Sequence, residues 1–200
     1  AVVIATGGYS ANNALCRKFN PEISALMPST ANPGGRYLDG AWGDALEFTK
    51  PFYAATVDLD KIQRICFLGG RLVDYTGADI YLNKNGLRFV NEGASHGDVL
   101  AELLKQPQRA MWVITDSQSK KGLSLENKLA DGAVKKFDSL RQVAAFIGCP
   151  AETLEETVTR FNDFVLKGVD KDFGKKVMLQ TISYPPFYVG QERVGVHYCC

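Results

Sequence analysis

The chain has 200 residues, 46% hydrophobic and 22% charged, a composition typical of a folded globular protein with one sizeable core or slightly more. Its 23 basic and 22 acidic residues leave a formal charge of +1, and no basic run carries interleaved aromatic residues, which argues against nucleic acid as a partner. The longest apolar runs are far shorter than the roughly 20 residues that span a bilayer, so the sequence predicts no membrane-spanning segment in this chain.

The first element is an apolar run at residues 2–5, Val-Val-Ile-Ala, which predicts a strand buried on both faces in a parallel sheet. Thr6, Gly7 and Gly8 follow it directly. Two glycines after such a strand let a ligand approach the main chain, as a dinucleotide cofactor requires, although this short motif alone is not specific. We therefore treat these three residues as candidates for cofactor binding.

A helix is predicted next, capped by residues 10–12 and ending near Phe19. The loop STANPGGRYLDGAW then leads through Gly43 and Asp44 into a predicted helix over residues 44–50. This region has two interpretations. It is either a mobile connector or a helix start at which Gly43 and Asp44 make polar contacts to a cofactor.

Residues 54–67 have strand character, and we place a domain boundary near residue 60. Residues 80–96, IYLNKNGLRFVNEGASH, predict a β-hairpin, because β-branched and aromatic residues flank an Asn-Lys-Asn-Gly turn that tolerates positive φ. The polar groups after the turn either present chemistry at a cleft or form a solvated loop: Arg88, Asn91, Glu92, Ser95 and His96.

The second half of the chain predicts alternating helices and strands. Periodicity and caps place helices at residues 97–106, 138–147 and 150–167, with polar helical turns to about Ala130. The helix at 138–147 begins with an Asp or Ser cap and closes at Gly148, and Gly168 ends the last one. The buried stripe of the last helix is predicted to be Leu154, Val158, Phe161 and Val165. Strands are predicted at residues 110–115, 187–189 and 193–198, and GVDKDFG (168–174) as a turn. This order predicts an α+β fold, with helices packed on a small mixed or antiparallel sheet and a short piece of a parallel-sheet domain.

The cysteines are odd in number and show neither CxxC nor Cys/His ligand spacing. We expect reduced, mostly buried thiols at Cys16, Cys66, Cys149, Cys199 and Cys200. Only His96 and His197 are available to supplement them in a four-ligand site, so the sequence predicts no metal site.

Four spaced segments together resemble a known family: ATGGYS (5–10), YLNKNGLRFVNE (81–92), TVTRFNDFVLKGVDKDFG (157–174) and GVHY (195–198). They are similar to the flavoprotein of the fumarate reductase and succinate dehydrogenase superfamily, above all to its soluble flavocytochrome c and urocanate reductase members. The resemblance covers essentially the whole chain. It implies a Rossmann-type domain that binds FAD and an inserted capping domain that closes over the substrate.

By this resemblance, residues 1–60 are part of the FAD-binding domain, residues 61–194 form the capping domain, and residues 195–200 are a strand returning to the FAD domain. The chain opens on an apolar run and stops within another, which leads us to expect a piece of a longer protein. The family's GxGxxG turn would precede it and the Gly-Gly after the GVHY segment would follow it. We therefore expect this chain alone to be inactive and not to hold FAD stably.

The departures from the family bear on the substrate. Fumarate reductases carry an Arg four residues after the Glu of the NE motif, where this sequence has His96. Their His-Pro at the entry to the cap is replaced by Ile65-Cys66, and a Glu and an Arg that feed protons align with about Leu72 and Tyr75. These differences predict that the substrate is not fumarate itself. The electron donor and the compartment stay open.

The resemblance assigns catalytic roles to His96 and His197, and substrate binding to Ser95, His197 and Tyr198. An imidazole can exchange protons at neutral pH, which suits His96 as a general acid, whereas the alternative makes it only a neighbour of a helix cap. For His197 the alternative is a core histidine bonded to backbone. Glu92 and Arg88 are interpreted as structural. We expect His96 and His197 to face one cavity in the intact protein.

The sequence thus predicts part of an FAD-dependent oxidoreductase that acts on a C–C double bond next to a carboxylate or carbonyl, with an unsaturated acid or enone as substrate. A second hypothesis is a catalytically inactive relative that uses the cap as a ligand-binding or interaction module. Its motivation is the absence of the family's Arg, His and Glu at the positions just described.

Overall fold

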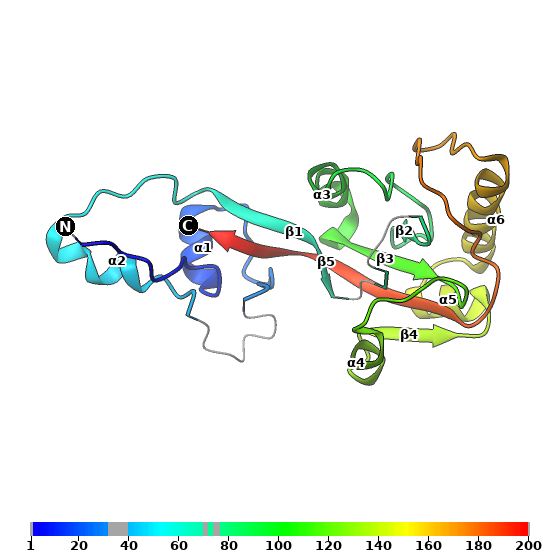
Figure 1. The fold of residues 1–200 in the computed structure, drawn as a ribbon, viewed down its shortest axis with the longest axis horizontal. Coiled ribbons are helices and arrows are strands. Elements are labelled where there is room, and N and C mark those ends of the chain that lie inside the picture. The colour runs from blue at the N-terminus through cyan, green and yellow to red at the C-terminus, as the bar shows by residue number, and fades with distance from the viewer. Residues whose placement is uncertain (1, 32–39, 70–71, 74–76, 200) are drawn as a thin grey trace. The chain divides into compact units, whose positions relative to one another are not determined.

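The structure, a computed structural model, describes residues 2–31, 40–69, 72–73 and 77–199 (Figure 1). The chain divides into two compact units. The first unit consists of Ala1–Ile65 and Val194–Cys200, and the second of Cys66–Arg193. The predicted boundaries at residues 60 and 194 concern domain identity, and they stay predictions.

The first unit is built around short helices. In α1 (Asn13–Phe19), Asn12 caps the first turn by accepting a hydrogen bond from the Leu15 N–H, and Asn20 ends the helix, as predicted. α2 (Asp44–Phe48) is shorter than the predicted 44–50 and continues into the 3-10 turn η1 (Lys50–Phe52), which has a proline in its first turn. Proline lacks the N–H that an α-helix needs in its interior, which favours ending α2 before it.

Residues 2–5 do not form the predicted buried strand. They have no regular secondary structure, and Val2 and Val3 are 90% and 89% exposed. A strand of this kind needs neighbours that satisfy its backbone N–H and C=O groups. Within the described part of the chain, no strand pairs with this run.

The predicted strand over residues 54–67 is only partly correct, because β1 spans Ile62–Gly69. Asp58 adopts a left-handed conformation with φ of 56°, and the Lys61 N–H donates to the Asp58 carbonyl. This turn interrupts the extended chain, so residues 54–61 do not enter the sheet.

The described residues form a five-stranded sheet in the order β1-β5-β3-β2, with β4 (Val134–Phe137) also paired to β5. β2 (Ile80–Leu82) runs antiparallel to β3 (Ala110–Thr115), with Ile80 opposite Ile114. β5 (Phe187–Cys199), the long red arrow in Figure 1, is antiparallel to both β3 and β4. The sequence predicted β3 with its observed bounds but missed β4, in which two exposed lysines obscure the strand pattern.

β5 is one continuous strand, whereas two separate strands were predicted at residues 187–189 and 193–198. The intervening Gly190, Gln191 and Glu192 all pair with β3, opposite Val113, Trp112 and Met111. Pairing with a neighbouring strand, which the sequence alone does not reveal, holds this polar interval extended.

The predicted hairpin is present only as its first strand and turn. Asn83 organises the turn, since its side chain accepts hydrogen bonds from the N–H groups of Asn85 and Leu87. The second strand is reduced to a single bridge between Leu82 and Arg88. β2 pairs with β3 instead. The segment after the turn is therefore not held in a strand, and contacts of its side chains determine its path.

The remaining helices of the second unit are α3 (His96–Lys105), α4 (Leu125–Ala130), α5 (Leu140–Ile147) and α6 (Ala151–Lys167), with the 3-10 turn η2 (Pro107–Arg109) after α3. Ser139 caps α5, and Gly148 and Gly168 end α5 and α6, as predicted. Leu154, Val158 and Phe161 of the predicted α6 stripe are buried in the core of this unit, and Val165 is partly buried and packs against it. α6 also buries Phe164. The core consists of Ile80, Leu82, Ile114, Val143, Ala144, Leu154, Val158, Phe161, Ile182, Phe187 and Val189.

No helix in the described ranges combines the length and apolar character needed to cross a membrane.

Candidate functional site

A cluster of four buried charges includes Glu92, which precedes Ser95 and His96 by a few residues in the chain. Arg88 donates from Nε to Glu92 Oε1 and from Nη2 to Glu92 Oε2, each at 2.8 Å, and from Nη2 to Asp170 Oδ2 at 2.8 Å. Lys175 Nζ lies 3.3 Å from Glu92 Oε2 and donates to the Asp79 carbonyl at 2.6 Å. The side chains are 4% exposed at Arg88 and 0% at the three others, so the two cations and two anions compensate each other out of water.

Backbone and aromatic groups complete this charge cluster. The Tyr81 N–H donates to Glu92 Oε1, and the Asp172 and Phe173 N–H groups donate to Asp170 Oδ1. Phe161 lies 5.1 Å from the Arg88 guanidinium and 5.2 Å from Lys175 Nζ, measured to the ring centroid. The bidentate Arg88–Glu92 pair and these contacts fix the geometry in several directions at once.

The cluster controls the ionisation of its own members. Burial by itself would raise the pKa of Asp170, but the hydrogen bond and charge of Arg88, with the Asp172 and Phe173 N–H groups, outweigh it and lower that pKa. Burial would likewise lower the pKa of Arg88, and Glu92 and Asp170 reverse the effect and raise it. The geometry agrees with the interpretation of Arg88 and Glu92 as structural residues.

Ser95 is the N-cap of α3. Its Oγ accepts a hydrogen bond from the Asp98 N–H at 3.2 Å and donates to Asp98 Oδ2 at 2.7 Å. The helix was predicted to begin at Gly97 and begins one residue earlier, at His96. The role of Ser95 in substrate binding stays a prediction, and the cap is a separate function that the structure shows.

His96 is the first residue of α3 and is exposed to solvent. Its ring packs edge-on against Phe67 with 5.0 Å between centroids, and its carbonyl accepts a hydrogen bond from Cys66 Sγ at 3.9 Å. Phe67 and Cys66 belong to β1, so this strand contacts both the ring and the backbone of His96, while the residue as a whole stays exposed. That arrangement suits a side chain that exchanges protons with a ligand.

His197 lies near the end of β5 in the first unit. Its Nδ1 lies 2.9 Å from Thr30 Oγ1, and its ring lies 3.8 Å from that of Tyr198 between centroids. The Thr30 N–H donates to the Val196 carbonyl, which anchors Thr30 beside the strand. This partner orients the imidazole, and Tyr198 is 57% exposed. Nothing in the sequence singled out Thr30 beyond its place in a polar loop.

Thr6 and Gly7 are exposed and Gly8 is half-buried. Gly7 has a φ of 78°, and a Cβ added there would meet no atom within 4 Å. The main chain at this point is therefore approachable, which is the property that binding of a dinucleotide requires.

Gly43 is the N-cap of α2, with a φ of 93°. A Cβ at this position would lie 2.7 Å from Leu15 Cδ2 and 3.0 Å from Tyr9 Cβ, so close packing already requires glycine here. Asp44 is exposed in the first turn of α2. Their contact with a cofactor stays a prediction.

Cys16 and Cys199 flank the backbone of Tyr9 in the first unit. The Tyr9 N–H donates to Cys199 Sγ at 3.2 Å, and Cys16 Sγ donates to the Tyr9 carbonyl at 3.4 Å. A hydrogen bond between the two thiols lowers the pKa of Cys199 and raises that of Cys16. The four described cysteines are free thiols, and Cys200 lies outside the described residues. No group of three or more potential metal ligands occurs in the described ranges.

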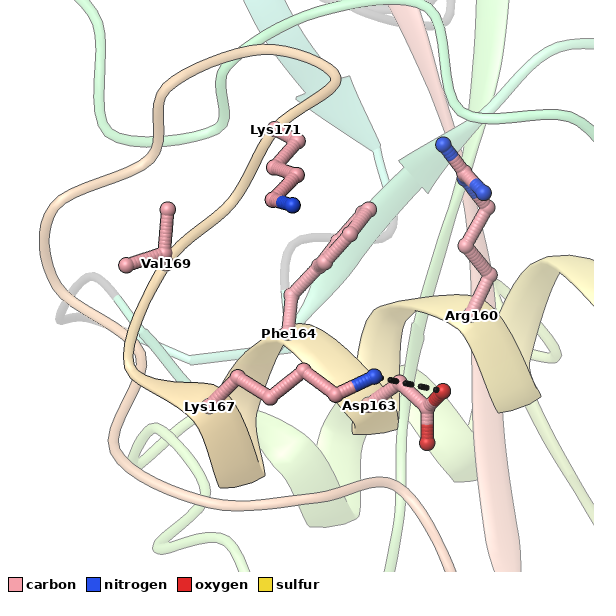
Figure 2. Close-up of a pocket in the computed structure, with 6 residues that line it drawn as sticks. All are labelled: Arg160, Asp163, Phe164, Lys167, Val169 and Lys171. Carbon is pink, nitrogen blue, oxygen red and sulfur yellow. Dashed lines mark hydrogen bonds and ion pairs between the residues drawn. The ribbon is translucent and has the colours of Figure 1, made fainter.

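A surface pocket of about 410 Å³ lies at the end of α6 (Figure 2). Its lining includes Lys167, which pairs with Asp163 at 3.3 Å, and Arg160, which pairs with Asp172 outside the pocket. None of the predicted site residues lines it. Its charged groups are exposed and mostly compensated within the protein.

The predicted site residues fall into both units. Ser95 and His96 belong to the second unit, and the others to the first: Thr6, Gly7, Gly8, Gly43, Asp44, His197 and Tyr198. The shared cavity of His96 and His197 stays a prediction. Leu72 is buried, with its carbonyl bonded to the Gly122 N–H, and Tyr75 lies outside the described residues. Sequence reasoning missed Asp170 and Lys175, which it placed in or beside a simple turn.

A family model described as the FAD binding domain matches residues 1–200. The chain is 30% identical over 205 residues to a fumarate reductase (cytochrome) of Shewanella frigidimarina, covering 99% of this chain and 35% of that protein. It is 27% identical to the NADH:acrylate oxidoreductase of Vibrio harveyi, over 98% of this chain and 20% of the relative. It is 24% identical to the urocanate reductase of Eggerthella lenta, over 99% and 34%.

Among solved structures, the open conformation of a flavocytochrome c3 fumarate reductase matches 98% of this chain and 35% of its own, with a TM-score of 0.75 and 27% identity. A 3-ketosteroid Δ1-dehydrogenase from Sterolibacterium denitrificans shares the fold over 94% of this chain and 40% of its own, with a TM-score of 0.64 at 18% identity. The chain spans 35% or less of the length of the three curated relatives named above.

Proposed function

Because this chain belongs to the FAD binding domain family, within the fumarate reductase and succinate dehydrogenase flavoprotein superfamily, we propose that it is part of an enzyme that reduces or desaturates a C–C bond next to a carboxylate or carbonyl. FAD is the cofactor of this family, and when bound it supplies the hydride chemistry that amino-acid side chains lack.

The observation that carries this proposal is the similarity of nearly the whole chain to reductases named for different substrates. Fumarate, acrylate and urocanate, the compounds in those names, share a double bond conjugated to a carboxylate. The common chemistry supports this substrate class without selecting one member. The comparisons offer no support for an inactive ligand-binding module.

We assign the first unit to the FAD-binding domain and the second to the capping domain. The exposed main chain at Thr6 and Gly7, with the left-handed conformation of Gly7, fits close approach of a dinucleotide. Gly8, Gly43 and Asp44 belong to the same proposed cofactor surface. We infer that the chain alone, which holds only part of that domain, is inactive.

His197, Tyr198 and Ser95 are assigned to substrate binding. Thr30 fixes the His197 ring through Nδ1, which leaves Nε2 for a ligand carboxylate or carbonyl. His96 is assigned as the general acid that donates a proton to the substrate carbon, since the residue is exposed and its ring packs against Phe67. Histidine at this position, where fumarate reductases carry arginine, favours a substrate other than fumarate.

The test uses the purified full-length protein. We expect it to be yellow, and its flavin, once reduced anaerobically by dithionite, to be reoxidised by at least one member of a panel of fumarate, acrylate, urocanate and an enone. Succinate is the control for a saturated acid. A colourless protein, or a bound flavin that no member of the panel reoxidises, refutes the proposal.

The role of His96 is tested by His96→Ala. Turnover should fall about 10²-fold or more, as expected for loss of a general acid, while reduction of the flavin by dithionite is unchanged. Unchanged turnover removes His96 from the mechanism.

A further inference from the structure

We propose that Asp170 and Lys175, two residues distant in sequence from the candidate site, are positioning residues for Ser95 and His96. This inference rests on the proposed function of His96 and adds to it. Both residues belong to the segment that follows α6, and they act through Arg88 and Glu92.

The first step is the connection between the two segments. Asp170 accepts from Arg88 Nη2 at 2.8 Å, and Lys175 Nζ lies 3.3 Å from Glu92 Oε2. The Lys175 N–H also donates to Asp170 Oδ2 at 3.2 Å, so one compact turn supplies both charges. The segment of residues 88–92 therefore meets an anion, Asp170, and a cation, Lys175, at a fixed separation. Its own charges, Arg88 and Glu92, can pair with them in only one alignment of the two segments.

The second step is the short path from Glu92 to the candidate site. Asn91 Oδ1 accepts from the Gly93 N–H at 2.8 Å, and the Asn91 carbonyl accepts from the Ala94 N–H at 3.0 Å. These bonds make residues 91–94 a tight turn that ends at the Ser95 cap. Because this turn is tight, a displacement of Glu92 also displaces Ser95 and His96.

The third step is the kind of interaction. Buried ion pairs contribute little more to stability than apolar side chains of similar volume, but their hydrogen bonds are directional. Lys175 and Glu92 both have fully buried side chains, and an apolar contact would hold the fold without fixing the angle of the loop. The four charges therefore fix the position of the loop more than they increase the stability of the fold.

The experiment uses the full-length, flavin-loaded protein. In the double variant Glu92→Gln/Lys175→Met, one anion and one cation are lost together, so the Arg88–Asp170 pair stays balanced and we expect the fold to be retained. Hydrogen exchange followed by mass spectrometry reads the order of residues 88–98 without reference to activity. The control is Arg160→Gln, which breaks the exposed Arg160–Asp172 pair in the same segment.

In the double variant we expect the peptides covering residues 88–98 to exchange faster than in the parent protein. Exchange in the other peptides should be the same as in the parent. Turnover should fall about 10- to 100-fold, because a misplaced proton donor affects the chemical step. KM should rise as well, because Ser95, which is assigned to substrate binding, is displaced together with His96. Asp170→Asn, which keeps the side-chain shape and leaves the Arg88–Glu92 pair in place, should give the same pattern and is the second variant if the double variant does not fold. The Arg160→Gln control should resemble the parent in both measurements.

Unchanged exchange at residues 88–98 refutes the proposal, and so does faster exchange spread across residues 66–193, which signals a purely structural cluster. Local loosening with unchanged turnover also refutes it. Failure of the proposed function is recognised separately, because the parent protein then turns over no unsaturated substrate; in that case local loosening still supports the positioning of the loop.

Discussion

Arg88 and Glu92 face each other through two hydrogen bonds of 2.8 Å, although the residues between them are not helical. The spacing of four residues is that of a helical ion pair, yet here a non-helical loop brings the two groups together and Asp170 and Lys175 complete their charges. The side chains of this cluster are almost inaccessible to water, so removing any one charge has consequences that a surface pair lacks.

Glu92→Ala should lower the free energy of unfolding by about 3–5 kcal/mol, because Arg88 and Lys175 would lose a shared buried anion. Urea unfolding followed by circular dichroism measures this change. Arg160→Ala, which opens the solvent-exposed pair with Asp172, is the matched control and should leave the midpoint almost unchanged. Similar losses of stability in both variants would show that burial does not determine how much an ion pair contributes to the free energy of unfolding.

Stability should fall as the pH drops below about 4, and Asp170 should account for part of the fall. Its pKa in the folded protein lies below the ordinary Asp value of about 3.9, so the unfolded chain takes up the proton first. The stabilisation is complete above the unfolded pKa and is lost as the pH falls through the folded one.

Asp170→Asn should therefore be less stable than the parent protein at neutral pH and show a flatter dependence between pH 5 and 2, in roughly the window expected for a depressed carboxyl pKa. Denaturant unfolding at a series of pH values measures both effects. Asp172→Asn is the control, since Arg160 also lowers the pKa of Asp172 but its carboxylate is more exposed. If the stability of Asp170→Asn and that of the parent protein changed in parallel with pH, Asp170 would not account for the loss of stability in acid.

Ser95 has two testable roles that a pair of variants separates. Ser95→Ala should cost about 1 kcal/mol of stability because the Asp98 N–H loses its cap, whereas Ser95→Asn keeps an N-cap acceptor and should be nearly neutral. Thermal unfolding measures the cap. If Ser95 also binds substrate, KM should rise in Ser95→Asn despite its unchanged stability; an unchanged KM there would limit Ser95 to the cap.

Thr30→Val should raise KM about 2- to 10-fold with little change in kcat, because the His197 ring loses a hydrogen bond worth about 0.5–1.5 kcal/mol. Thr30→Ser retains the hydroxyl and is the matched control. Steady-state kinetics of the full-length protein with its best substrate provides the measurement. Equal KM values in Thr30→Val and the parent would mean that Thr30 does not orient His197 for binding.

Local signals in the sequence were sufficient for much of the second unit. The caps at Ser139 and Gly148, the stripe of α6 and the bounds of β3 depend on residues within a few positions of one another. The family membership likewise followed from four short segments in the correct order. The caps and the helix stripe are short-range features, so capping chemistry and hydrophobic period are enough to predict them.

Only the tertiary structure decided which segments meet. The run at residues 2–5 has the composition of a buried strand but no described partner, while the polar interval at 190–192 is a strand because β3 pairs with it. Asp170 and Lys175 look like solvated turn residues in sequence, and they are buried because Arg88 and Glu92, at sequence separations of 82 residues or more, neutralise them. Strand pairing and burial of charge depend on a partner that is remote in the chain, and no local pattern specifies that partner.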